Sequence, residues 1–175
     1  MTSKLAHTVR NVLHVDDDPN MLQLVSKYLS KDFNVQSIVD PTQAIDHLVS
    51  SGCRLVILDI QMGEYNGLDL LRTIKRLDGG ILVVMLTGLV SIESVLVSMR
   101  DGAEACLFKP LNDPKELIET MEECATKVLR WHRSVNELLS RRATENSRMR
   151  QSVSTIPAWP TGEAHVMPGS SNLIH

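Results

Sequence analysis

The stretch NVLHVDDDP at residues 11–19 decides the fold, because it joins a short apolar run to three carboxylates and a proline. The run from Val12 to Val15 has the length and the aliphatic character of a strand that is buried on both faces. Asp18 followed by Pro19 is typical of a helix start, where a carboxylate caps free N–H groups and proline takes the first helical position. The stretch therefore predicts a strand, a polar turn and a helix.

The same succession recurs four more times in the first 126 residues. Amphipathic segments, with apolar residues three and four positions apart, separate the apolar runs. Asp40-Pro41 and Asp113-Pro114 repeat the helix-start signal. Five strand–helix units predict an α/β fold, a doubly wound parallel sheet with helices on both faces. The further apolar runs lie at residues 35–39, 55–58, 81–86 and 105–108.

Composition excludes several classes of protein. The 175 residues are 43% hydrophobic and 22% charged, which is typical of a globular protein. The three cysteines are odd in number and far apart, so they predict neither a disulfide framework nor a paired metal site, as in a reducing compartment. The chain starts with a polar segment, and no apolar run approaches the roughly 20 residues that span a bilayer. We therefore expect a cytoplasmic protein without membrane contact.

Charge and periodicity divide the chain into three predicted parts. Residues 1–126 carry 18 acidic and 11 basic side chains, whereas residues 127–150 carry 7 basic and 2 acidic ones. From Leu117 to Leu138 apolar residues recur with a 3.5-residue period, which predicts a helix longer than the sheet needs. Residues 151–175 are rich in Pro, Gly and Ser, which is typical of a disordered tail. We predict a domain at 1–126, a basic amphipathic helical extension at 127–150 and a tail at 151–175.

Polar residues follow the predicted strands at one end. Asp16 and Asp17 come directly after the first strand, Asp59 after the third, Thr87 at the end of the fourth and Lys109 after the fifth. The carboxyl ends of parallel strands lie at one edge of a sheet, which is where ligands bind. We therefore expect these five side chains to converge in one cleft.

This set of side chains fits phosphoryl chemistry. Carboxylates held close together resist ionisation unless a cation joins them. Mg²⁺ fits, because it binds carboxylates together with phosphate oxygens and water. One carboxylate is then free to act as a nucleophile toward phosphorus, while Lys109 and Thr87 contact phosphoryl oxygens.

These residues resemble the receiver domain of two-component response regulators. The matches are the acidic pair Asp16-Asp17, Asp59 with Gly67 eight residues beyond it, Thr87, and Lys109-Pro110. They lie on four separate strands in the family's order, and the resemblance covers residues 11–126. It implies a flavodoxin-like sheet with strand order 2-1-3-4-5.

The resemblance also implies the role of each acidic residue. Asp59 is the phosphoacceptor, which takes a phosphoryl group from a histidine kinase or a phosphotransfer protein in a phosphorelay. Asp17, Asp59 and the backbone carbonyl of Gln61 bind Mg²⁺ directly, and Asp16 acts through a bound water. Such a phosphoprotein is not an enzyme in the usual sense, although it promotes its own phosphotransfer and dephosphorylation.

Further roles follow from the same resemblance, together with two departures. Lys109 contacts the phosphoryl group, and the peptide bond between Lys109 and Pro110 is cis. Thr87 swings toward the phosphoryl group. Gln61 and Leu89 occupy positions that tune the phosphoryl lifetime. Gly63 stands where the family usually has proline, which predicts a looser loop beside the site. Cys106 stands at the family's aromatic switch position, where it lacks the ring that reports the switch.

Two other functions compete with this interpretation. The pattern Asp16-x-Asp18, with Thr87 and Lys109 later, is similar to haloacid-dehalogenase phosphatases, in which Asp16 is the nucleophile. Such enzymes need further acidic ligands, but Asp113 and Glu116 are better explained as helix-start residues. A phosphorylation-independent scaffold is the third hypothesis, and it leaves the complete set of polar residues unexplained.

The sequence leaves the output open, since it indicates no second globular domain. The helix over 117–139 fits a homodimer, because a 3.5-residue period favours a coiled coil. An unknown effector protein that binds the extension is another hypothesis. Nucleic-acid binding by the basic residues is a third, which the near absence of aromatic residues disfavours.

Overall fold

The computed structural model describes residues 9–88 and 91–154. The chain divides into a compact unit that ends at Val135 and a second unit that begins at Asn136. The predicted disordered tail lies mostly outside the described residues, except that residues 151–154 are helical. No helix of the described residues is long and apolar enough to cross a bilayer.

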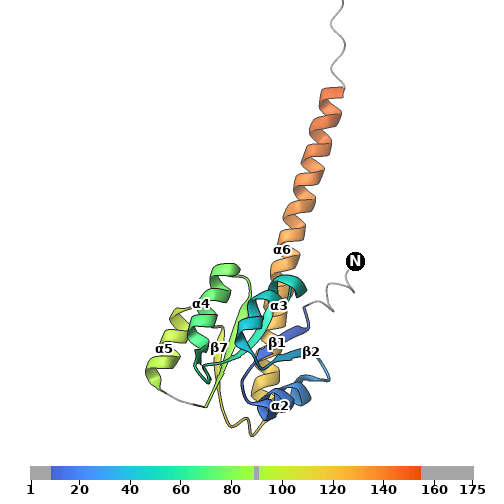
Figure 1. Cartoon of the computed structure of the whole chain (residues 1–175). Helices are drawn as coiled ribbons and strands as arrows, with labels where there is room; N and C mark the ends of the chain where they lie inside the picture. Colours follow the sequence, from blue (N-terminus) through green and yellow to red (C-terminus); the bar gives the residue numbers. More distant parts are fainter. Residues whose placement is uncertain (1–8, 89–90, 155–175) are drawn as a thin grey trace, which may run out of the picture. The chain divides into compact units, whose positions relative to one another are not determined.

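A five-stranded parallel sheet forms the centre of the first unit (Figure 1). Its strand order is β2-β1-β3-β6-β7, which is the order 2-1-3-4-5 if the short hairpin strands β4 and β5 are left out. The register is regular, with Val12 of β1 opposite Val35 of β2 and Leu55 of β3. The predicted fold class and strand order are confirmed. The strands are β1 (Asn11–Val15), β2 (Asn34–Ile38), β3 (Leu55–Asp59), β6 (Leu82–Thr87) and β7 (Ala105–Phe108).

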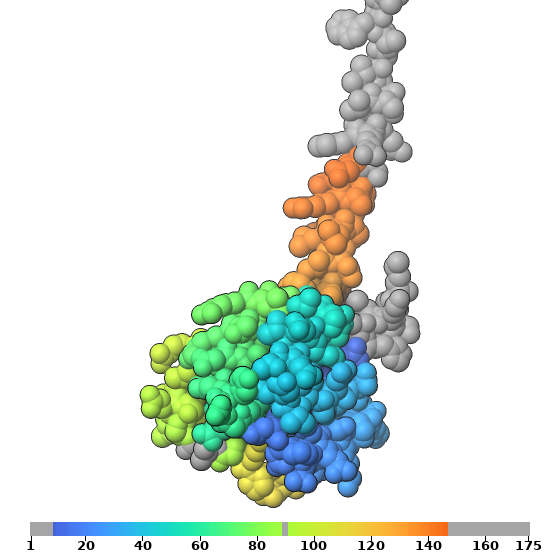
Figure 2. Space-filling model, in the orientation of Figure 1, coloured from blue at the N-terminus to red at the C-terminus, as the bar shows by residue number. Residues whose placement is uncertain are grey.

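Helices cover both faces of this sheet. One apolar layer joins the sheet to α2 (Pro19–Leu29) and α6 (Pro114–Ser154), through residues such as Val25 and Leu117. The opposite layer joins it to α3 (Ala44–Ser51) and α4 (Gly67–Leu77), through Leu48 and Leu71. Figure 2 shows α3 and α4, in cyan and green, covering the face turned toward the reader. A further helix, α5 (Ile92–Arg100), packs against the same layer through Val97.

The predicted helix starts are capped as the sequence indicates. The Asp18 carboxylate accepts a hydrogen bond from the Asn20 N–H at 2.9 Å, and Asp113 accepts one from the Lys115 N–H at 2.9 Å. Asp40 does the same, but a 3₁₀ turn, η1 (Pro41–Gln43), precedes α3 there. These caps fix where the chain turns after each strand end, and so fix the edge that carries the polar residues.

A short hairpin that the sequence did not indicate follows β3. Its strands are β4 (Gln61–Met62) and β5 (Tyr65–Asn66), which pair antiparallel across the two-residue turn Gly63-Glu64. Gly63 has φ 59°, which proline, locked near −65°, cannot adopt. Gly63, which departs from the family pattern, therefore has a structural role, because it forms part of a tight turn beside the site.

The long helix α6 corrects one expectation about the apolar seam. Val128 is only 4% exposed and belongs to the core of the first unit together with Met121 and Cys124. We expected Val128 to lie beyond the residues that the sheet covers, but the covering part of the helix continues past residue 126. The same 3.5-residue spacing serves packing on the sheet and packing on a partner, so the period alone does not show where the sheet contact ends. Leu138 and Leu139 remain exposed, at 61% and 58%.

Candidate functional site

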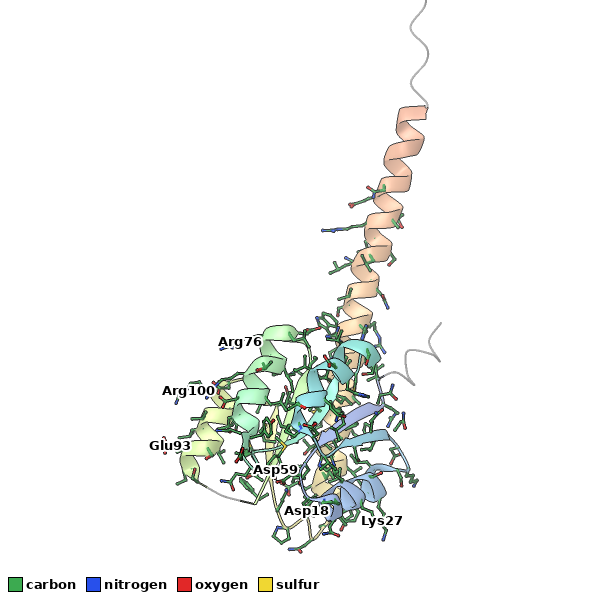
Figure 3. All side chains as sticks on the ribbon, viewed as in Figure 1. Asp18, Lys27, Asp59, Arg76, Glu93 and Arg100 are labelled. Carbon is green, nitrogen blue, oxygen red and sulfur yellow. The ribbon has the colours of Figure 1, made fainter. Side chains whose placement is uncertain are left out.

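The predicted acidic residues come together at one edge of the sheet. Asp16 and Asp17 directly follow β1, and Asp59 is the last residue of β3. Each offers a carboxylate oxygen, and these oxygens lie within 4.8 Å of one another. The labels of Asp59 and of Asp18, which caps α2, mark this edge in Figure 3. Three carboxylates this close form a candidate site for a hard divalent cation.

Lys109, which follows β7, joins two of these carboxylates. Its ammonium Nζ lies 2.7 Å from Asp16 Oδ2 and 2.9 Å from Asp59 Oδ2, and it donates a hydrogen bond to each. The side chains of Asp16 and Asp59 are 0% and 8% exposed. Because buried carboxylates need a partner of opposite charge, the Lys109 ammonium stabilises the pair.

Burial and pairing shift the pKa values of this group. Burial alone raises the pKa of Asp16, but the neighbouring His14 ring, the Lys109 ammonium and the Asp18 N–H outweigh it and lower the pKa overall. Burial raises the pKa of Asp59 and outweighs the opposing effect of Lys109. Burial lowers the pKa of Lys109, but its two carboxylate partners raise it overall, so the ammonium stays charged. The site thus combines a firmly ionised carboxylate, a less acidic one and a fixed cation.

A close backbone contact shapes the loop after Asp59. The Gly67 N–H donates to the Ile60 carbonyl at 2.7 Å, where α4 begins. A Cβ atom at Gly67 would overlap the carbonyl oxygen of Asp59. The Asn66 side chain caps α4 by accepting from the Leu68 N–H at 2.9 Å. Only glycine allows this contact, which explains why it stands eight residues after the acidic residue.

An open cleft lies beside the acidic cluster. Its volume is about 590 Å³, and Asp17, Gln61, Tyr65 and Ser94 are among the residues that line it. Asp17 is exposed to solvent, unlike Asp16 and Asp59. Gln61, whose backbone carbonyl the resemblance assigns to the metal, lies on the wall of the same cleft. A ligand therefore reaches the cluster from the side of Asp17.

Thr87 and the Lys109-Pro110 pair lie at the same edge. Thr87 ends β6 and is 1% exposed, and its carbonyl accepts a hydrogen bond from the Lys109 N–H at 2.8 Å. The Lys109–Pro110 peptide bond is cis, as the resemblance implies. Cys106 is half-buried, with its Sγ 2.9 Å from Ser98 Oγ. Leu89 lies outside the described residues.

Sequence reasoning missed one residue at this site. His14, on β1, is 0% exposed, and its Nε2 lies 3.7 Å from Asp16 Oδ2. The sequence interpretation treated it as a member of an apolar run. The signal that it carried was a polar side chain at an inward position of a strand buried on both faces.

Comparison with known proteins agrees with this geometry. The family model of the response regulator receiver domain matches residues 12–122, which is more than half of the chain. The DNA-binding response regulator MtrA of Mycolicibacterium smegmatis is 33% identical over 110 residues, which are 62% of this chain and 47% of MtrA. The chain thus spans about half the length of such curated relatives. By name they are response regulators, which are signalling proteins.

Solved structures give the same result. The receiver domain of NtrX from Brucella abortus is 30% identical to this chain and superposes with a TM-score of 0.62. The superposition covers 66% of this chain and 98% of that domain. A CheY-like receiver domain protein from Methanospirillum hungatei is 25% identical, with a TM-score of 0.65 over 69% of this chain and 97% of that one. Fold, site geometry and family model agree, and the chain belongs to the response regulator receiver domain family.

Proposed function

We propose that this chain is the response regulator of a two-component phosphorelay, in which Asp59 accepts a phosphoryl group in a Mg²⁺-dependent reaction. The observation that carries the proposal is the Lys109 ammonium, which bridges Asp16 and Asp59 at 2.7 and 2.9 Å while Asp17 lies beside them. The donor is a histidine kinase or a phosphotransfer protein, as for other members of the family.

The residues present fit a magnesium ion. Asp17, Asp59 and the backbone carbonyl of Gln61 would hold it directly, and Asp16 would act through a bound water. The ion, when bound, neutralises negative charge on the carboxylates and the phosphoryl oxygens. Asp17 is the exposed member of the cluster and lines the open cleft, so this part of the site is accessible from solvent.

The chain's own residues account for the transfer step. A carboxylate oxygen of Asp59 forms a bond to phosphorus while the bond between phosphorus and the donor's imidazole nitrogen breaks, and the imidazole leaves. Lys109 is already within hydrogen-bond distance of Asp59, so its ammonium turns to a phosphoryl oxygen with little movement. Thr87, at the end of the neighbouring strand, donates a hydrogen bond to another phosphoryl oxygen.

We predict that the chain gains one phosphoryl group when it is incubated with Mg²⁺ and acetyl phosphate. Asp59→Asn should abolish the gain, because an amide is a poor nucleophile. Intact-mass spectrometry measures the added mass directly. Asp18→Asn is the matched control, since Asp18 undergoes the same change beside the site but serves as a helix cap. Equal labelling of the Asp59→Asn variant would contradict the assignment.

Replacing Asp17 by asparagine should weaken Mg²⁺ binding by about tenfold or more, because it removes one negative ligand. Asp18→Asn should change the affinity much less, since Asp18 is not part of the cluster. Calorimetric titration with Mg²⁺ measures both affinities. Equal losses in the two variants would show that general negative charge, and not a ligand at position 17, attracts the ion.

The helical extension is the candidate for the regulator's signalling output. We propose that the receiver, predicted to end at residue 126, extends through the packed Val128, and that the exposed part of residues 127–150 carries the output, through a homodimer or an effector protein. Trp131 already has a cation–π contact, because the Arg54 guanidinium lies 5.7 Å from the centre of the Trp131 ring. Leu138 and Leu139 are adjacent exposed leucines on the extension, where Arg141 pairs with Glu137 at 2.6 Å. Exposed apolar residues flanked by charged pairs are typical of a helix that pairs with a copy of itself.

The double variant Leu138→Asp and Leu139→Asp should therefore convert a dimer into a monomer. Burying each leucine contributes roughly 1.5–3 kcal/mol, from which the cost of association is subtracted, so placing two carboxylates at this contact should abolish a dimer that the leucines hold together. Sedimentation equilibrium measures it, with Asn136→Asp as a control at an exposed polar position. A wild-type chain that stays monomeric at high micromolar concentration would contradict self-pairing and leave these residues to an effector or to nucleic acid.

A further inference from the structure

His14 is a polar side chain buried under the acidic cluster. It is 0% exposed, and neither of its ring nitrogens has a hydrogen-bond partner among the described residues. Side chains alternate along a strand, so His14 lies on the same face of β1 as Val12 and Asp16. Val12 belongs to the apolar layer beneath α2 and α6. The imidazole is therefore enclosed by aliphatic side chains, with the cluster as its polar neighbour.

Such a ring is unfavourable at this position unless it serves a purpose. A buried polar atom without a hydrogen-bond partner loses its hydrogen bonds to water without replacing them. The neighbouring inward positions hold Val12 on the same strand and Ile57 on β3, which pairs with His14 in register. An aliphatic residue at position 14 would avoid the loss, so packing does not explain the histidine.

The acceptor that faces this ring is Asp16 Oδ2, which lies 3.7 Å from His14 Nε2. This distance is too long for a hydrogen bond, but a shift of about 0.8 Å would form one. In this structure Oδ2 accepts from Lys109 at 2.7 Å, and Oδ1 accepts from the Asp18 N–H at 3.0 Å. Both carboxylate oxygens of Asp16 therefore already have donors, and the imidazole is a spare one.

Phosphorylation of Asp59 changes this arrangement. When the Lys109 ammonium turns to a phosphoryl oxygen, Asp16 Oδ2 loses its ammonium donor. The Asp16 side chain is 0% exposed, so bulk solvent cannot supply a replacement. His14 Nε2 lies 3.7 Å from the same oxygen, and among the described residues it has no other hydrogen bond to break.

We propose that His14 is a positioning residue of the phosphorylated state. It donates its Nε2–H to Asp16 Oδ2 and so replaces Lys109, which keeps the Asp16 carboxylate oriented toward the cation. The inference rests on the proposed phosphorylation of Asp59, and it deepens that function by naming what holds Asp16 once Lys109 has moved.

The test compares the wild-type full chain with His14→Val and His14→Gln. Valine removes the donor and suits a buried strand, whereas the glutamine amide keeps an N–H.

Fluoroberyllate, with saturating Mg²⁺, is the mimic of the phosphoryl group, and fluorine NMR titration measures its affinity. We expect His14→Val to weaken fluoroberyllate binding by about tenfold, as for one buried hydrogen bond to a charged acceptor, and His14→Gln to restore most of it. Without ligand, His14→Val should melt no lower than wild type, since it removes two unpaired nitrogens.

Nitrogen NMR of the His14 ring gives a second readout that a purely structural role would not move. Addition of Mg²⁺ and fluoroberyllate should shift the Nε2–H signal as the hydrogen bond to Asp16 forms, whereas the Nδ1 signal changes little. Equal fluoroberyllate affinity in wild type and His14→Val, or equal loss in the valine and glutamine variants, would overturn this inference alone. Failure of the wild-type chain to bind fluoroberyllate would overturn the proposed function together with it.

Discussion

Replacing Gly67 by alanine is expected to lower the free energy of unfolding by about 3 kcal/mol or more, because a side chain here collides with backbone. The added Cβ would overlap the Asp59 carbonyl oxygen and lie 3.0 Å from Ile60 Cα. The backbone cannot retreat easily, since the Gly67 N–H donates to the Ile60 carbonyl and the next residue, Leu68, is buried in the core. The displaced segment carries Asp59, so phosphorylation should fall as well. Urea denaturation measures the change in stability.

Gly79→Ala provides the matched control for this substitution. Nothing lies within 4 Å of a Cβ at Gly79, so alanine there should change the free energy of unfolding by no more than about 0.5 kcal/mol. Similar stabilities for Gly67→Ala and Gly79→Ala would contradict the close contact between the start of α4 and the acceptor strand.

Lys109→Ala should destabilise the metal-free protein by about 3–5 kcal/mol, the range for removing one partner of a buried ion pair. Without the ammonium, Asp16 and Asp59 face each other at 0% and 8% side-chain exposure with no cation between them. Mg²⁺ should restore much of the lost stability and bind at least as tightly as in wild type, because a competing positive charge is gone. Urea denaturation with and without Mg²⁺ measures both effects.

Lys127→Ala is the control for this prediction, because it removes a lysine whose ion pair is exposed. Lys127 Nζ lies 2.7 Å from Glu104 Oε1, but its side chain is 59% exposed, so its loss should be worth less than about 1 kcal/mol. A Lys109→Ala variant that is no less stable than Lys127→Ala, and that gains nothing from Mg²⁺, would contradict the electrostatic role given to Lys109.

The sequence predicted the main architecture because its signals are local and repeated. Apolar runs such as residues 55–58 and the Asp18-Pro19 cap mark strands and helix starts directly, and the structure confirms them. The convergence of Asp16, Asp59 and Lys109 follows from parallel strand topology, since their strands must end at the same edge.

Other features lie beyond what local patterns show. The β4–β5 hairpin has two residues in each strand, too few for an alternating pattern to appear. The burial of Val128 depends on how far α6 contacts the sheet, which the 3.5-residue period does not encode. His14 was hidden because its neighbours are aliphatic, and its significance depends on the 3.7 Å approach to Asp16. These features are set by tertiary distances, which have no signature in the spacing of residues along the chain.

The central claim is that Asp59 carries the phosphoryl group, and chemical trapping tests it most directly. Borohydride reduces an aspartyl phosphate to homoserine, so the modified residue is identified by mass spectrometry of peptides after incubation with Mg²⁺ and acetyl phosphate. Conversion at position 59, absent from the Asp59→Asn variant, is the result that we predict. Conversion at Asp16 would favour a haloacid-dehalogenase-like nucleophile and would contradict the assignment, as would reduction at neither residue.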